Sequence, residues 1–207
     1  MKSAVIVQAR FASTRLRGKV LLPLAGHTVL WHVMERCHKI DGADVVVCAV
    51  PDGEINDPVA EEAKRCGAVV TRGSESDVLD RYNKAAIAVG ADVVMRVTSD
   101  CPLIEPDVCA QVLALVRAGV ADYACNNMPR SFPHGLDCEA FTAKWLAEAA
   151  RVATAPDERE HVTPWLRNNA SLRRVNLYGP GGEAALQRIT LDTPEDYDVI
   201  RAIMEAA

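Results

Sequence analysis

Short apolar runs rich in valine and isoleucine alternate along the chain with longer stretches whose apolar residues recur at helical spacing. Leu30, Val33, Met34 and Cys37 have the i, i+3, i+4, i+7 spacing of one helix face, and residues 79–86 show a less regular version. Continuous apolar strands between amphipathic helices predict a mostly parallel sheet covered by helices on both faces. Ligands of such sheets bind beyond the carboxyl ends of the strands. Strands are predicted at residues 4–8, 45–50, 68–71, 93–98 and 123–126.

The pattern changes after residue 127. Pro129, Pro133 and Gly135 interrupt the chain before helical patterns at 143–152 and 158–168. We interpret residues from about 128 to 170 as a small inserted, lid-like section of a single domain that covers residues 1–207. The chain is then predicted to rejoin the main fold through a strand at 188–191 and a helix that begins at Pro194, with Thr193 as its cap.

Composition narrows the possible classes of protein. The 207 residues are 49% hydrophobic and 25% charged, which is typical of a globular protein with one core. A net charge of -5 argues against nucleic acid or an anionic membrane as a partner. Seven cysteines without a C-x-x-C pair favour reduced thiols, and no apolar run is long enough for a signal peptide or a membrane span. We therefore expect a cytoplasmic protein.

The first predicted strand leads directly into a basic segment. Residues 8–19 carry cations at Arg10, Arg15, Arg17 and Lys19 and hydroxyl groups beside them. Arginine binds phosphate oxygens through two N–H groups, lysine adds a compact charge, and the backbone N–H groups of such a turn can bind an anion. The segment is neither a Walker A loop nor a G-x-G-x-x-G motif. A solvated charged loop is the alternative, but the position after a buried strand favours a polyphosphate site.

Two aspartates are predicted at the same edge of the sheet. Asp100 follows the strand at 93–98, and Asp192 follows the strand predicted at 188–191. Magnesium prefers a few carboxylates together with water and substrate oxygens, which is what transfer of a nucleotidyl group requires. The residues alone leave an alternative open for each, because Asp100 could be a turn residue before Pro102 and Asp192 a turn or cap residue before Thr193.

The basic segment has the sequence A-R-F-A-S-T-R-L-R-G-K from residue 9, which resembles the N-terminal signature of the cytidylyltransferases that activate sugar acids. The resemblance is strongest to the branch of SpsF-type spore coat polysaccharide biosynthesis proteins, related to the acylneuraminate and 3-deoxy-manno-octulosonate cytidylyltransferases. It covers nearly the whole chain. Arg17 departs from it, because the family often has proline there. The matching motifs are T-S-D-C-P-L-I from residue 98, H-G-L-D-C-E from 134, E-H-V-T from 160 and L-D-T-P-E-D from 191.

The resemblance implies a Rossmann-like, three-layer α/β fold of the nucleotide-diphospho-sugar transferase type. It implies a Mg²⁺-dependent enzyme that transfers CMP from CTP to a sugar acid or related acceptor and releases pyrophosphate, for surface polysaccharide biosynthesis. Asp100 and Asp192 are then the expected magnesium ligands, with Arg15, Lys19 and Asp100 as catalytic residues. A homodimer built through the inserted section is also expected. The nucleotide-binding residues are expected to be Gln8, Ala9, Arg10, Ser13, Arg15, Lys19 and Ser99.

The acceptor is expected to bind near the proline- and glycine-rich turn and the helical region after it. Asp137 is the best candidate, because G-L-D-x-E is a motif of the family. Each histidine there could instead be a satisfied surface or core residue, and the segment from residue 160 could dock the lid or a second subunit. Cys101, beside Asp100, is a candidate reactive thiol. The acceptor-binding candidates are His134, Asp137, Glu139, Glu160 and His161.

Two other functions stay open at this point. A glycosyltransferase that uses a preformed nucleotide sugar would share the sheet, the loop and the metal site, but it would release a nucleoside diphosphate instead of pyrophosphate. A catalytically silent nucleotide-binding subunit is the other possibility. The intact set of Arg10, Arg15, Lys19, Asp100 and Asp192 argues against it.

Overall fold

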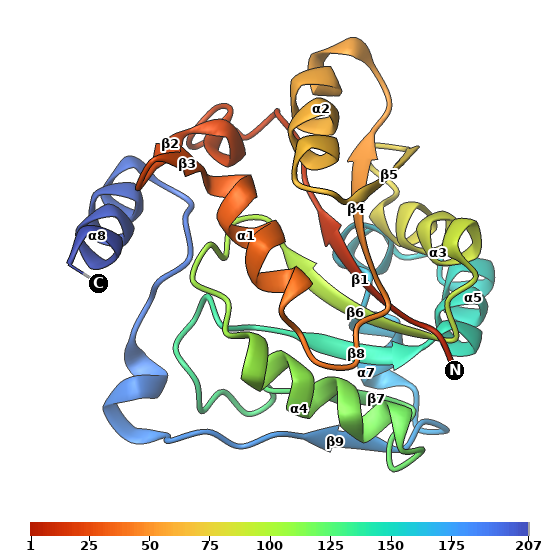
Figure 1. The fold of residues 1–207 in the computed structure, drawn as a ribbon. Coiled ribbons are helices and arrows are strands. Elements are labelled where there is room, and N and C mark those ends of the chain that lie inside the picture. The colour runs from red at the N-terminus through yellow and green to blue at the C-terminus, as the bar shows by residue number, and fades with distance from the viewer. Residues whose placement is uncertain (207) are drawn as a thin grey trace.

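Within residues 1–206, which are those that the structure describes, a computed structural model shows seven strands in one central sheet (Figure 1). The strands are β1 (Ser3–Gln8), β4 (Val45–Pro51), β5 (Val69–Gly73), β6 (Val93–Thr98), β7 (Tyr123–Cys125), β8 (Glu139–Thr142) and β9 (Arg174–Asn176). Their order across the sheet is β5-β4-β1-β6-β8-β7-β9. Every neighbouring pair is parallel except the two pairs that include β8. The predicted mostly parallel sheet is confirmed.

Helices cover both faces of this sheet. The helices are α1 (Val29–His38), α2 (Asp57–Arg65), α3 (Val78–Val89), α4 (Pro106–Arg117), α5 (Ala143–Val152), α6 (Pro156–His161), α7 (Pro164–Asn168) and α8 (Pro194–Glu205). Helices α1, α2 and α4 pack on one face and α3, α5 and α7 on the other. Short 3₁₀ helices lie at η1 (Lys19–Leu21), η2 (Glu54–Asn56) and η3 (Gly182–Leu186), and β2 (Pro23–Leu24) pairs with β3 (His27–Thr28). No helix among residues 1–206 is long and apolar enough to cross a membrane.

The alternation of side chains along β1 shows why both faces are covered. Val5 and Val7 pack into a core shared with α1, α2 and α4, whereas Ala4 and Ile6 pack into a second core with α3, α5 and α7. Successive strand residues point to opposite faces, so a strand that is buried on both faces must be apolar throughout. The three-layer α/β fold follows from this burial, and the helix layers are visible on either side of the sheet in Figure 1.

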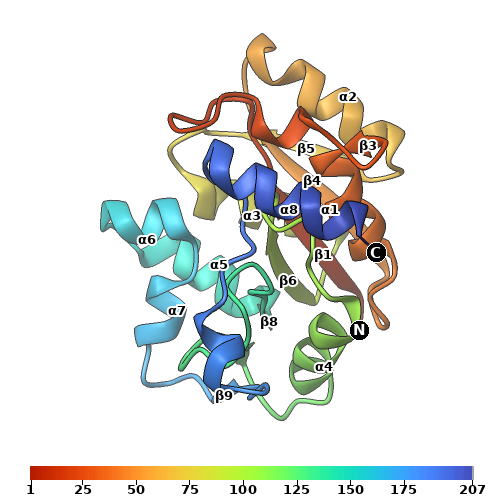
Figure 2. The ribbon, with the colours of Figure 1, turned by 90° about the vertical axis from the view of Figure 1, so that its left-hand side faces the viewer.

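Residues 128–170 do not form a separate insertion, contrary to the sequence-based interpretation. Strand β8 lies inside the sheet between β6 and β7, and α5 buries Leu146 and Ala149 in the core below it. Only α6, which buries none of its side chains, projects from the domain as a lid-like element (Figure 2). The single helix predicted at 158–168 is two helices, because Val162 has a φ of 71° and Pro164 begins α7.

The predicted strand at 188–191 is also wrong. One isolated bridge between His134 and Arg188 is the only ladder contact described for it within residues 1–206. That bridge consists of His134 N donating to Gln187 O at 2.9 Å and Ile189 N donating to His134 O at 2.7 Å, and beyond it Leu191 N donates to Asp100 O in a loop at 2.8 Å. The apolar pattern reflects burial of Leu191 in a small core beneath α8, the dark blue helix beside β2 and β3 in Figures 1 and 2.

The helix expected at Pro194 is confirmed as α8. Thr193 Oγ1 accepts from Asp196 N at 3.2 Å, and Asp196 returns the contact by accepting from Thr193 N at 2.9 Å. This reciprocal pair is a capping box, which satisfies two backbone donors that the first turn of a helix leaves without partners. Ile200 of α8 packs with Leu24 and Leu191 in the small core.

A buried carboxylate joins β6, β7, β8 and the α6–α7 region. Glu139 on β8 is 1% exposed and accepts from Arg96 Nη1 at 2.8 Å, Tyr123 Oη at 2.5 Å, Thr163 Oγ1 at 3.2 Å and Arg167 Nε at 2.9 Å. Burial raises the pKa of this carboxyl, but the two arginines outweigh burial and hold it below its ordinary value. Glu139 therefore has a structural role inside the domain, and the expectation that it binds the acceptor is not supported.

We expect Glu139→Gln to lower the free energy of unfolding by about 3 kcal/mol, because the partly buried Arg96 and Arg167 lose their counter-charge. The pKa of Glu139 is lowered from 4.5 on folding, so its contribution is present above pH 4.5 and is lost as the pH falls through the folded-state pKa. Urea unfolding at several pH values measures both effects. Glu148→Gln, which removes an exposed pair with Arg151, is the control and should change little. Equal stability of wild type and Glu139→Gln at neutral pH would contradict this account.

Candidate functional site

A cleft of about 1020 Å³ opens where β1 and β6 end. Its walls come from the loop after β1, the β5–α3 loop, the end of β6, α6 and the segment before α8. The cleft thus lies at the carboxyl edge of the parallel sheet, which is where the sequence predicted that ligands bind. Residues predicted from the sequence that line it are Gln8, Ala9, Arg10, Ser13, Arg15, Lys19, Ser99, Asp100, Glu160, His161 and Asp192.

The basic segment of residues 8–19 forms a loop at the end of β1, called the basic loop below, and hydrogen bonds hold both of its ends. Phe11 N donates to the buried Asn56 Oδ1 at 2.9 Å, and Gly18 N donates to Phe11 O at 3.0 Å. Gly18 has a φ of 68°, and a Cβ atom there would lie 3.2 Å from the Phe11 ring. The guanidinium carbon of Arg17 lies 5.7 Å from the centre of the same ring. The arginine found where the family often has proline therefore packs on the Phe11 side chain of its own loop. The turn at Gly18 delivers Lys19 into the cleft at the start of η1.

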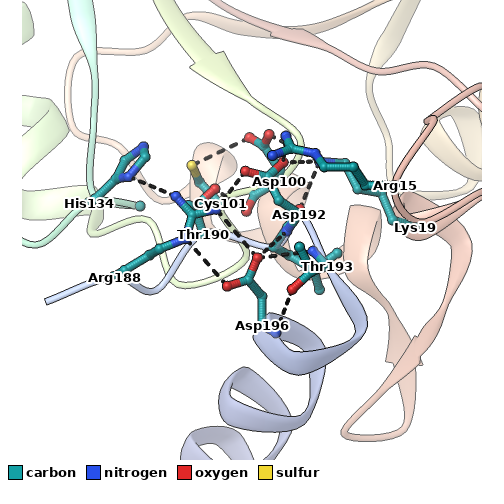
Figure 3. A network of polar contacts seen from close by, with 12 residues as sticks. Arg15, Lys19, Asp100, Cys101, His134, Arg188, Thr190, Asp192, Thr193 and Asp196 are labelled. Carbon is teal, nitrogen blue, oxygen red and sulfur yellow. Dashed lines mark hydrogen bonds and ion pairs between the residues drawn. The ribbon is translucent and has the colours of Figure 1, made fainter.

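Lys19 joins the two aspartates that were predicted at one edge of the sheet. Its Nζ atom lies 3.2 Å from Asp100 Oδ2 and 2.9 Å from Asp192 Oδ1, and it donates to Leu191 O at 2.7 Å. The Lys19 side chain is 13% exposed, so these contacts are largely shielded from water. Figure 3 shows the ammonium and the two carboxylates pointing toward one another from separate parts of the chain. The structure therefore brings the basic loop and both aspartates together.

Asp192 is surrounded by cations. Arg15 Nη2 lies 2.9 Å from its Oδ1 atom, on the same side as Lys19, and Arg188 Nη2 lies 2.6 Å from its Oδ2 atom. Burial raises the pKa of this carboxyl, but hydrogen bonds from Lys19 and Arg188 outweigh it and hold the pKa below its ordinary value. Asp192 is thus ionised at neutral pH. Arg188 was missed by the sequence analysis, because a single arginine in a segment predicted to be a strand gives no signal of this contact.

Asp100 and Asp192 are the carboxylates of the cleft that fit magnesium. Across residues 1–206, no group of three or more histidine, cysteine, aspartate or glutamate side chains could hold a metal ion. Asp100 and Asp192 nevertheless converge on one cation, the Lys19 ammonium. Magnesium is commonly bound by one or two carboxylates, with water and substrate phosphates supplying the other oxygens. The two aspartates fit that pattern when a polyphosphate completes the donor set.

The sequence analysis also missed Asp77 and Arg159, which line another wall of the cleft. Asp77 caps α3 by accepting from Asp80 N at 3.0 Å, and its other oxygen pairs with Arg159 of α6. Arg10 reaches this wall, since its Nη1 atom lies 3.5 Å from Glu75 Oε1. The Asp77–Arg159 pair therefore joins α6 to the start of α3 at the wall of the cleft. An aspartate before an apolar helix can be recognised in a sequence as a helix cap. Its pairing with Arg159, 82 residues away, cannot be recognised there.

The predicted acceptor residues lie in three different places. Glu160 and His161 of α6 line the cleft. His134 and Asp137 lie on the loop between β7 and β8, outside the residues that line it, where Asp137 pairs with Arg130 at 2.7 Å. Glu139 is buried, as described above.

The cysteines agree with reduced thiols, since all seven are free and buried. Burial raises the pKa of Cys101 well above its ordinary value, and the neighbouring Asp100 raises it further. Its thiol is therefore protonated at neutral pH, and the suggestion that Cys101 is reactive is not supported.

Comparison with known proteins identifies the family to which this cleft belongs. The cytidylyltransferase family model matches residues 4–207. The chain belongs to this family. It is 35% identical over 209 residues to the spore coat polysaccharide biosynthesis protein SpsF of Bacillus subtilis (strain 168), covering 98% of this chain and 86% of that protein. It is 29% identical over 243 residues to the 3-deoxy-manno-octulosonate cytidylyltransferase of Anaeromyxobacter sp. (strain Fw109-5), covering 98% and 97% of the two chains.

Solved structures agree with this membership. A cytidylyltransferase from Leptospira borgpetersenii serovar Hardjo-bovis (strain JB197) superposes with a TM-score of 0.94 at 32% identity, covering 100% of this chain and 88% of that one. A CMP:2-keto-3-deoxy-manno-octonic acid synthetase complexed with CTP superposes with a TM-score of 0.75 at 20% identity, covering 100% and 99%. The second similarity shows that the fold is shared. Membership of the family favours a cytidylyltransferase over the glycosyltransferase that the residues had left open.

We expect Gly18→Ala to destabilise the protein by more than Gly90→Ala. Both glycines have a left-handed φ, 68° and 62°, so each substitution costs about 1 kcal/mol of backbone strain. A Cβ at Gly90 meets nothing within 4 Å, whereas a Cβ at Gly18 must also displace the Phe11 ring. Urea unfolding of the single variants and of Gly18→Ala with Phe11→Leu measures this coupling. An equal cost for the two alanine variants would show that the ring does not restrict the loop.

Proposed function

We propose that this chain transfers CMP from CTP to a sugar acid or a related acceptor and releases pyrophosphate, in the synthesis of a surface polysaccharide. The family match and the names of the relatives support the reaction class, and the CTP complex of a structural neighbour supports the nucleotide. One observation carries the assignment to this cleft: a basic loop and two convergent carboxylates meet at the ammonium of Lys19. Polyphosphate and magnesium require these two kinds of group side by side.

The triphosphate would bind to the basic loop. The Arg10 and Arg15 side chains are about half exposed or more and are paired with Glu75 and Asp192. The Arg10–Glu75 pair is exposed and contributes little to stability, and Arg15 is 62% exposed although Asp192 is 13% exposed. Each guanidinium group can therefore exchange a carboxylate for a phosphate, which carries charge of the same sign. Arginine binds phosphate oxygens in a bidentate way, and Lys19 adds a point charge. These three side chains would neutralise the β- and γ-phosphates.

The transfer itself is a displacement at the α-phosphorus. An oxygen of the acceptor forms the new P–O bond, the bond from the α-phosphorus to the bridging oxygen breaks, and pyrophosphate leaves with that electron pair. A hydroxyl acceptor also loses its proton to water or to a nearby base. Magnesium bound at Asp100 and Asp192 would supply positive charge to the phosphate oxygens. Arg15 and Lys19 would stabilise the leaving pyrophosphate, so catalysis consists of positioning and charge neutralisation.

The acceptor would enter beside α6. Glu160 and His161 line the cleft there, and both side chains are exposed, so they can reach a polar ligand. His134 and Asp137 lie beyond Arg188 on the other side of Asp192 and would take part only in binding a larger acceptor. The cytoplasm is the proposed location, supported by seven free cysteines. A homodimer is proposed from the family resemblance.

We expect Asp100→Asn to reduce pyrophosphate release from CTP at least about 100-fold, because a neutral amide is a poor magnesium ligand. The assay uses CTP, MgCl₂ and 3-deoxy-manno-octulosonate, the acceptor in the name of one relative. Asp198→Asn is the control, since Asp198 is exposed on α8 and pairs with Arg201 outside the cleft. Undiminished release by Asp100→Asn would contradict the assignment. Release of a nucleoside diphosphate from a nucleotide sugar would support the glycosyltransferase alternative instead.

A further inference from the structure

Arg188 lies at the centre of a polar network beside the proposed metal ligands. Its Nη2 atom is 2.6 Å from Asp192 Oδ2, its Nε atom is 3.3 Å from Asp196 Oδ1, and its Nη1 atom is 3.1 Å from His134 Nδ1. Figure 3 shows the guanidinium pointing toward these groups from the segment before α8. Neither the sequence motifs nor the proposed function gives this arginine a role.

The two oxygens of Asp192 are held by different partners. Lys19 and Arg15 contact Oδ1, and the same Lys19 ammonium contacts Asp100, so Oδ1 is the oxygen on the side of the second carboxylate. Arg188 contacts Oδ2 on the other side. The terminal torsion of an aspartate has broad energy wells, so the plane of the carboxylate is set by its hydrogen bonds. Arg188 therefore fixes the orientation in which Oδ1 faces Asp100.

The contact between Arg188 and Asp192 Oδ2 would remain when Arg15 and Lys19 leave Oδ1. In the proposed function Arg15 and Lys19 turn to the phosphates of the nucleotide, and Oδ1 loses both of its contacts. The contact between Arg188 and Oδ2 does not compete with the nucleotide, because Arg188 is not among the residues that line the cleft. The carboxylate of Asp192 would then depend on Arg188 for its orientation.

Arg188 is itself held by the first turn of α8. Asp196 Oδ2 accepts from Asp192 N and Thr193 N, both at 2.9 Å, while Asp196 Oδ1 accepts from Arg188 Nε. The same aspartate thus caps the helix, binds the backbone of Asp192 and orients the arginine that binds the side chain of Asp192. A planar guanidinium can reach partners on three sides, whereas a lysine ammonium at the end of a flexible stem cannot keep this geometry.

We infer that Arg188 is a positioning residue for the metal ligand Asp192: it holds Oδ2 so that Oδ1 and Asp100 present their oxygens to one cation. This inference rests on the proposed function. The Arg188 side chain is 41% exposed, whereas its partners Asp192 and Asp196 are 13% and 16% exposed, so loss of the arginine also affects the fold around them. A role confined to the fold would change CTP binding equally with and without Mg²⁺, whereas the positioning role affects specifically the part of binding that depends on the metal.

The test is calorimetric titration of CTP into the wild type, Arg188→Gln, Arg188→Lys and Arg201→Gln, once with MgCl₂ and once with EDTA. Groups that orient metal ligands change metal affinity about 10-fold or more when they are removed. Arg188→Gln should therefore lose about 10-fold of the tightening that Mg²⁺ gives to CTP binding, while its Kd in EDTA stays within about 2-fold of the wild type. Arg188→Lys should lie between these two proteins. Arg201→Gln, which removes an exposed arginine of α8, should behave as the wild type does.

Two results would overturn the inference. Equal weakening of CTP binding with Mg²⁺ and with EDTA would show that Arg188 acts on the nucleotide or on the fold and not through the metal ligand. Unchanged binding in both conditions would show that Asp192 needs no such support. A wild type that binds CTP in neither condition would overturn the proposed function together with this inference. If Arg188→Gln unfolds, as circular dichroism would show, the comparison of Arg188→Lys with Arg201→Gln makes the same distinction.

Discussion

Two carboxylates, those of Asp100 and Asp192, lie against a single ammonium group, and the arrangement of the cleft depends on that contact. Like charges this close repel strongly in a partly buried site, so they need a cation between them. Lys19 supplies it because the left-handed turn at Gly18 directs η1 into the cleft. The backbone bond from Leu191 N to Asp100 O ties the same segments together. Three parts of the chain that are distant in sequence therefore meet at one edge of the sheet.

The same charges can serve two states of the protein. In the structure Arg15 and Lys19 pair with Asp192. In the proposed function, a nucleotide with magnesium would bring both a cation for the carboxylates and an anion for the basic loop, so each charged group would exchange one partner for another of the same sign. Such an exchange lets the cleft be ordered in advance, which is what catalysis by positioning requires.

The sequence predicts best those strands that are apolar throughout. Strands β1, β4 and β6 are recognisable because burial on both faces makes them apolar throughout, and the basic loop is recognisable because it directly follows β1. Strand β8 was missed, since four residues that begin with a buried glutamate do not read as a central strand. Glu139 was assigned to the acceptor because it follows a proline- and glycine-rich turn in a motif of the family, whereas Arg96 and Arg167, which neutralise it, come from distant elements. The segment 188–191 was predicted as a strand because it contains apolar residues. Leu191 is instead buried beneath α8, and the segment does not join the sheet.

The most direct test of the account is a crystal structure of the protein with CTP and MgCl₂. We expect the triphosphate against Arg15 and Lys19, with the ammonium of Lys19 moved from Asp192 to the phosphates. Magnesium should lie about 2.0–2.1 Å from oxygens of Asp100 and Asp192, the usual distance for this ion. A nucleotide bound outside this cleft, or a magnesium ion held by other side chains, would contradict the account.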